Sequence, residues 1–164
     1  MSLESQAQSL KEYLNEELAI YRELLVLSKK KQKLLLERFS TDLMLIVNEE
    51  EKLIRRIAEI EESRLKCIEM FTGNAQSTMD EAIEKIADTK IKSDVWVIAT
   101  DLKDVIGQIK DINLHNQKLL EQALELTQYS LSIITAPPRE VTYRAPGKNK
   151  PTLPRSPTLI DRKA

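Results

Sequence analysis

All six prolines of this 164-residue chain lie after residue 136, and this distribution constrains the fold more than any other feature. A proline inside a helix removes one backbone hydrogen bond and clashes with the preceding turn, so helix interiors rarely tolerate it. Residues 1–136 therefore lack the residue that most strongly breaks helices. Apolar residues make up 41% of the chain, charged residues 31%, and only three residues are glycine, which is typical of a helical bundle or coiled coil.

Apolar residues within this first part recur every three or four positions, the spacing of an amphipathic helix. The pattern predicts long helices over residues 2–39, 42–72 and 93–136 and a short helix over 78–89. We therefore expect an all-α fold, an elongated and mainly antiparallel bundle or coiled coil of three long helices and one short helix. The boundaries are predicted from residues that favour helix ends: Ser40, Thr41 and Asp42, then Gly73 and Asn74, then Thr78 with Glu81, and Ser93.

Residues 137–164 differ from the rest of the chain in composition and charge. They contain seven Lys or Arg against two Asp or Glu, whereas residues 1–136 contain 18 against 24. Their apolar content is too low for a core of their own. We expect two parts, a helical bundle domain over residues 1–136 and a Pro-rich, basic, disordered tail over 137–164.

The last predicted helix carries one long apolar seam in which polar residues stand near the middle. Asn113 and Asn116 both fall within the apolar stripe, one helical turn apart. Polar residues in such a seam cost stability but can fix register and partner choice, so we expect these two to form a specificity layer. The seam comprises Val95, Ile98, Leu102, Val105, Ile109, Ile112, Asn116, Leu119, Ala123, Leu126, Ser130 and Ile133.

Beyond the asparagines, the stripe contains smaller and more polar residues than before them. We expect this half to pack less tightly, which is the property that a groove for a partner helix requires. The predicted binding residues are Leu119, Leu120, Ala123, Leu126, Thr127, Ser130, Ile133 and Ile134.

The sequence contains no pattern that predicts an enzyme, a cofactor or a metal site. His115 is the only histidine, so the two Glu-x-x-His motifs of a di-iron bundle cannot form, and it falls on a polar helix face. Cys67 falls on an apolar seam, where we expect a packed, inert thiol. The acidic run 49–51 is expected to be solvated. The N-terminus lacks the pattern of a secretion signal and the longest apolar run, 43–47, is too short to span a bilayer, so we expect a soluble, cytoplasmic protein.

Several stretches together resemble a known family, the FlgN-type flagellar export chaperones. The stretch "DLMLIVNEEEKLIRRIAEIEESRLKCI" is similar to the second helix of that family, with a glutamate-rich turn and a later glutamate-containing turn before an arginine, here Arg64. The stretch "DINLHNQKLLEQALELTQYSLSII" is similar to the last helix, where Asn-x-x-Asn precedes a Leu-Leu pair. "TYRAPGK" and the terminal "LIDRKA" resemble the tails of Gram-positive members, so the resemblance covers nearly the whole chain.

The resemblance implies a cytoplasmic chaperone of the hook–filament junction proteins. Such a chaperone binds their C-terminal helical segments, prevents premature assembly and delivers them to the flagellar type III export gate. In the family the client binds the C-terminal helix, and a C-terminal tyrosine contacts the membrane protein of the export gate. Tyr129 and Tyr143 are the two candidates here. No nucleic acid and no membrane insertion is implied, and a homodimer of the client-free protein is left open.

Two other functions remain open on the sequence alone. A structural coiled-coil adaptor without a client cycle would show the same seams, and stable assembly with one permanent partner would favour it. The basic tail could instead bind nucleic acid or another anionic surface. It offers only Tyr143 for stacking on bases, so it does not resemble a single-strand-binding segment.

Overall fold

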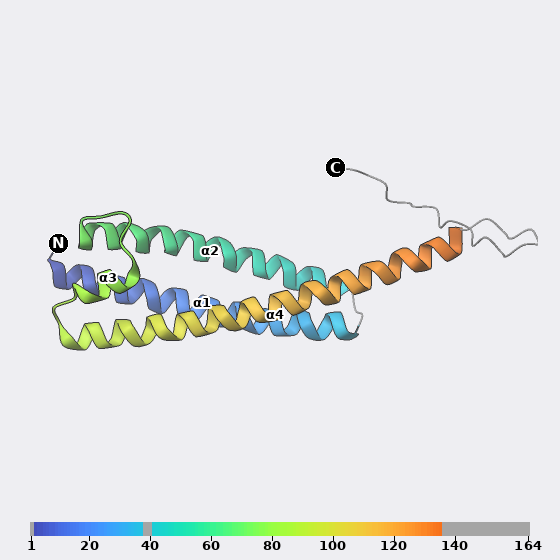
Figure 1. The fold of residues 1–164 in the computed structure, drawn as a ribbon, viewed down its shortest axis with the longest axis horizontal. Helices are drawn as coiled ribbons and strands as arrows, with labels where there is room; N and C mark the ends of the chain where they lie inside the picture. The colour runs from blue at the N-terminus through green and yellow to red at the C-terminus, as the bar shows by residue number, and fades with distance from the viewer. Residues whose placement is uncertain (1, 38–40, 136–164) are drawn as a thin grey trace, which may run out of the picture. The chain divides into compact units, whose positions relative to one another are not determined.

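The computed structural model describes residues 2–37 and 41–135. It contains three long helices and one short helix: α1 (Leu3–Glu37), α2 (Thr41–Thr72), α3 (Met79–Glu84) and α4 (Thr89–Thr135) (Figure 1). No strand occurs in these described ranges. The predicted all-α class is therefore confirmed.

The chain divides into two compact units after Leu119. The first unit holds α1, α2, α3 and the N-terminal part of α4, and it contains the core. The described part of the second unit is the rest of α4, residues 120–135, called distal α4 below. The predicted tail, residues 137–164, lies outside the described residues.

Local hydrogen bonds explain where the helices begin and end. Gly73, with a φ of 77°, follows the end of α2 in the left-handed conformation that glycine adopts without strain. Thr78 and Glu81 form the predicted capping box before α3, with reciprocal bonds of 3.2 and 2.9 Å. Two predicted boundaries were wrong. The short helix ends at Glu84 rather than at residue 89, and α4 begins at Thr89 rather than at residue 93.

Asp88 accounts for the early start of α4. Its carboxylate oxygen Oδ1 accepts a hydrogen bond of 2.8 Å from the backbone N–H of Ile91, as an N-cap residue does. Its carbonyl also accepts from the N–H of Lys92 at 2.9 Å. Ser93, the predicted cap, consequently lies inside the first turns of the helix.

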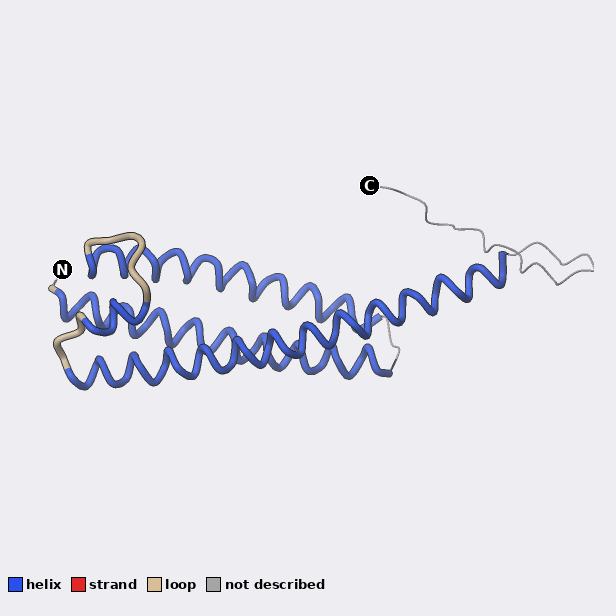
Figure 2. The backbone as a smooth tube through the Cα atoms, viewed as in Figure 1, coloured by secondary structure: helices blue, strands red, loops and turns tan. Residues whose placement is uncertain are grey.

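In the first unit α1 runs antiparallel to α2, and the N-terminal part of α4 runs parallel to α1 (Figure 2). Two contacts show the parallel pairing, because Lys11 of α1 meets Asp94 of α4 at 2.6 Å and Ser28 meets Asn116 further along both helices. Aliphatic side chains from all four helices form one core, as the heptad seams predicted. Its members include Leu10, Leu14, Ile20, Leu53, Ile57, Ile68, Ala82, Val95, Leu102 and Ile109.

Two partly buried ion pairs fix the register of α1 against α2. Glu17 accepts a bond of 2.9 Å from Nε of Arg64, and Lys31 donates one of 3.0 Å to Glu50. The two pairs are separated by two heptad repeats on both helices, which is the arrangement expected for one continuous antiparallel register. Glu50 is only 7% exposed, so the expectation that residues 49–51 are solvated was wrong at its central position.

Of the two carboxylates in these ion pairs, Glu17 is the less exposed, at 2% against 7% for Glu50. Burial raises the pKa of Glu17, and the hydrogen bond and charge of Arg64 oppose that increase. Burial also raises the pKa of nearby Tyr21, and the charges of Glu17 and Glu61 raise it further. Arg64 is therefore the group that offsets part of the cost of burying the Glu17 carboxylate.

Candidate functional site

Distal α4 presents large apolar side chains to solvent. The exposed fractions range from 45% for Leu126 to 78% for Ile134. A soluble helix normally buries such a stripe against a neighbour, and exposed apolar surface of this kind marks interaction sites. The large apolar side chains involved are Leu120, Leu124, Leu126, Leu131, Ile133 and Ile134.

The hydroxyl groups of Ser130 and Thr135 on distal α4 are satisfied within the helix itself. Ser130 donates to the carbonyl of Leu126 at 2.9 Å, and Thr135 donates to that of Leu131 at 2.8 Å. A serine bonded in this way presents mainly its methylene group outward. Ser130 therefore behaves as a small residue between larger apolar neighbours and does not offer a polar group to a partner.

The structure places the predicted binding residues as follows. Leu119 is half-buried and belongs to the first unit. Of the remaining seven, six are exposed on distal α4, and the side chain of Thr127 lies outside the described part of the chain. Sequence reasoning missed two residues of this surface, Leu124 and Leu131, which are 58% and 47% exposed. Their separation of seven residues is a heptad signal and could have revealed them.

The predicted layer of two asparagines is present only at Asn116. Asn113 is exposed, so its assignment to a buried layer was wrong, because the inward face of α4 at this level is centred on Asn116. Asn116 is 3% exposed, and its Nδ2 donates to the backbone carbonyl of Ser28 at 3.1 Å. Its Oδ1 and the hydroxyl of Ser28 are buried without a hydrogen-bond partner among the described residues. The polar layer thus joins α4 to α1.

The other residues singled out from the sequence are also located. Tyr129 is 65% exposed on distal α4, while Tyr143 lies outside the described residues. His115 is exposed, as its polar face predicted. Cys67 is buried, its Sγ lies 3.4 Å from the carbonyl oxygen of Gln6, and burial raises the pKa of its thiol.

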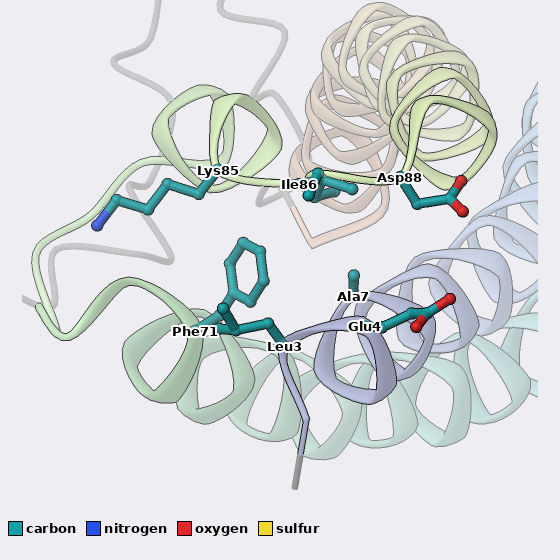
Figure 3. A pocket seen from close by; sticks show the side chains of 8 residues that line it. Leu3, Glu4, Ala7, Phe71, Lys85, Ile86 and Asp88 are labelled. Carbon is teal, nitrogen blue, oxygen red and sulfur yellow. The ribbon is translucent and has the colours of Figure 1, made fainter.

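A second candidate is a cavity of about 310 Å³ at the end of the first unit where α1 begins. Its walls are mainly apolar, with Leu3, Phe71 and Ile86 around it, and the carboxylates of Glu4 and Asp88 lie on one side (Figure 3). The Lys85 side chain points away from it and donates to the carbonyl of Thr72 at 2.9 Å. Since Asp88 already caps α4, the cavity offers little free polar chemistry.

Among residues 2–37 and 41–135, no three His, Cys, Asp or Glu side chains are grouped so that they could hold a metal ion. None of the described helices has the length and apolar content required to cross a membrane.

Comparison with known proteins identifies the family of the chain. A family model described as FlgN protein matches residues 1–151. A relative from Bacillus subtilis (strain 168), described as "Uncharacterized protein YvyG", is 27% identical over 161 residues, which are 96% of this chain and 99% of the relative. No solved structure matches the chain. Because the family match spans most of the sequence and the fold is the helical one that the motifs predicted, the chain belongs to the FlgN family of flagellar export chaperones.

Proposed function

We propose that the chain is a cytoplasmic flagellar export chaperone for hook–filament junction proteins. Distal α4 binds the amphipathic C-terminal helix region of the client, prevents its premature assembly and presents it to the export gate. No nucleotide or metal takes part in this cycle, because the binding free energy comes from burial of apolar surface.

The observation that supports this proposal is the change in burial along one helix. The seam of α4 is buried at Leu102, Val105 and Ile109, where it belongs to the core of the first unit. The same heptad pattern continues into distal α4, but Leu126 and Ile133 are 45% and 60% exposed. An exposed heptad seam is a surface against which a helix of the client would pack, as one helix of a coiled coil packs against another.

Tyr129 is the described candidate for contact with the export gate. At about 100° per residue it lies at the edge of the predicted stripe, beside Leu126 and Ile133, and it is 65% exposed. In this proposal a client covers the centre of the stripe and leaves the outer edge of the Tyr129 ring to the export gate. We expect Tyr129→Ala to retain client capture and to reduce export, which separates binding from delivery.

The test compares one charged substitution on each part of the same seam. Leu126→Glu is expected to abolish capture of the C-terminal segment of a junction protein from the same bacterium while retaining wild-type helicity. Ile109→Glu places a carboxylate in the core, where Ile109 is 7% exposed, and is expected to unfold or severely destabilise the bundle. Gln128→Glu adds the same charge to the polar face of distal α4 and serves as the control that should bind normally.

Binding is measured by pull-down and titration, and folding by circular dichroism with a thermal melt. If Leu126→Glu unfolds the chain as badly as Ile109→Glu does, distal α4 is ordinary core. If Leu126→Glu folds and captures the client fully, the binding surface lies elsewhere. A permanent complex that survives export assays would favour the coiled-coil adaptor. Light scattering of the free chain checks the homodimer, which stays a prediction.

A further inference from the structure

Distal α4 carries two apolar seams side by side rather than one. Seam one is the continuation of the core seam and consists of Ala123, Leu126, Ser130 and Ile133. Seam two is displaced by one position and repeats with the same alternation of four and three residues. It consists of Leu120, Leu124, Thr127, Leu131 and Ile134.

Seam two begins only where distal α4 begins. The positions that would extend it toward the N-terminus are Gln117, Asn113, Lys110 and Ile106, and three of these four are polar. Within seam two, Leu120 and Leu124 are 50% and 58% exposed. The first unit therefore has no counterpart of seam two, and the core of the bundle does not explain why these leucines are apolar.

The geometry of a helix separates the two seams too widely for one partner helix. Each residue advances the direction of the side chain by about 100°, so seams displaced by one residue are roughly 100° apart around α4. A single partner helix in a two-stranded coiled coil contacts one narrow heptad seam. Two seams at this angle are what a helix shows when it has two helical neighbours, as in a four-helix bundle.

The charges of distal α4 limit what those neighbours can be. Residues 120–135 contain Glu121 and Glu125 and no Lys or Arg. A second copy of distal α4 would bring the same two glutamates and no basic residue. The basic tail, residues 137–164, has the complementary charge but contains six prolines, so it cannot supply a continuous amphipathic helix.

We propose that distal α4 binds two amphipathic helices of one client chain, a helical hairpin with basic residues beside its apolar seams. One helix of the hairpin packs on seam one and the other on seam two, so the complex contains a local three-helix bundle. This inference rests on the proposed chaperone function, and it specifies the client element as a pair of helices rather than a single one.

Photo-crosslinking of the full chain tests which part of the client meets each seam. A photoreactive benzoylphenylalanine replaces Leu131 of seam two, Ile133 of seam one or, as the control, Gln128 of the polar face. The probe is the C-terminal helical region of a junction protein from the same bacterium. We expect positions 131 and 133 to crosslink to two different client helices, and position 128 to crosslink weakly. Crosslinks of 131 and 133 to one and the same client helix overturn the inference, as do crosslinks of 131 to a second copy of the chain or to residues 137–164.

Matched charged substitutions then separate this inference from the proposed function. Leu124→Glu alters seam two and Leu126→Glu alters seam one, and each is expected to lower the affinity for the probe by roughly 30-fold or more. Gln128→Glu should leave the affinity unchanged. Loss of binding in Leu126→Glu with wild-type affinity in Leu124→Glu would overturn the two-helix inference and leave the proposed function intact. Failure of the wild-type chain to bind the probe would overturn both.

Discussion

Replacement of Arg64 by methionine is expected to destabilise the bundle in a strongly pH-dependent way. The substitution keeps an unbranched side chain of similar length and removes the cation that lies 2.9 Å from the Glu17 carboxylate. Because Glu17 is 2% exposed, its ionised form then has neither water nor a paired charge. We expect the folded variant to take up a proton at Glu17.

The free-energy cost of protonating Glu17 gives the size of the expected destabilisation. A carboxyl group with the ordinary pKa of 4.5 is neutralised at pH 7 at a cost of about 3.4 kcal/mol, from about 1.36 kcal/mol per pH unit. The same relation gives about 0.7 kcal/mol at pH 5. Since the pKa of Glu17 in the folded variant lies above 4.5, the folded state binds more protons than the unfolded state in this range. Its stability therefore falls as the pH rises.

Urea unfolding followed by circular dichroism at pH 5, 6 and 7 measures this effect. Because the pKa of Glu17 is already raised in the wild type, the difference in unfolding free energy between wild type and Arg64→Met should be smaller than about 3.4 kcal/mol at pH 7 and should shrink toward pH 5. Arg56→Met is the matched control, because Arg56 pairs with Glu16 at 3.7 Å and Glu16 is 52% exposed. That control should change stability by less than about 0.5 kcal/mol at every pH. A pH-independent loss in Arg64→Met, or one that persists after Glu17→Gln is added, would refute the reasoning.

Four further outcomes are expected. Gly107→Ala should raise the unfolding free energy by about 0.5–1 kcal/mol in a urea titration. Gly107 lies inside α4, and an added Cβ meets no described atom within 4 Å. An unchanged or lower unfolding free energy would contradict this. Ser28→Ala should stabilise the fold by about 1 kcal/mol, and Asn116→Leu should retain the melting temperature while altering oligomeric state or client choice. A clear loss of stability in Ser28→Ala would instead indicate a water bound between Oγ of Ser28 and Oδ1 of Asn116. Cys67 should react with a thiol reagent only as fast as the bundle opens, and rapid labelling of the native chain would disprove its burial.

The sequence was sufficient to predict the helical elements because each depends on local signals. The heptad positions of α4 correctly predicted core residues such as Val95, Leu102 and Ile109. The capping box at Thr78 was visible as a spacing of three residues. The start of α4 was missed because Asp88 and Ser93 are both good caps, and only the backbone path after α3 decides between them.

Buried charges could not be predicted from single helices. Glu17 is buried because Arg64 of another helix faces it, and Glu50 because Lys31 does. The periodicity of one helix does not reveal which residue of a second helix will stand opposite. Six of the eight predicted binding residues are exposed on distal α4, and their role in binding stays a prediction. Leu124 and Leu131 of seam two were not predicted, because they fall outside the stripe that continues the core seam.

The order of charges along the α1–α2 interface also disfavours incorrect alignment of the two helices while the chain folds. Apolar heptads repeat, so α2 could slide along α1 by two repeats and still match apolar residues with apolar residues. One such slide would bring Glu17 opposite Glu50, and the opposite slide would bring Lys31 opposite Arg64. Each misaligned pairing buries two like charges, at a cost of several kcal/mol. Misaligned hairpins of α1 and α2 should therefore be short-lived, and the native alignment is selected before the remaining helices can lock an error in place.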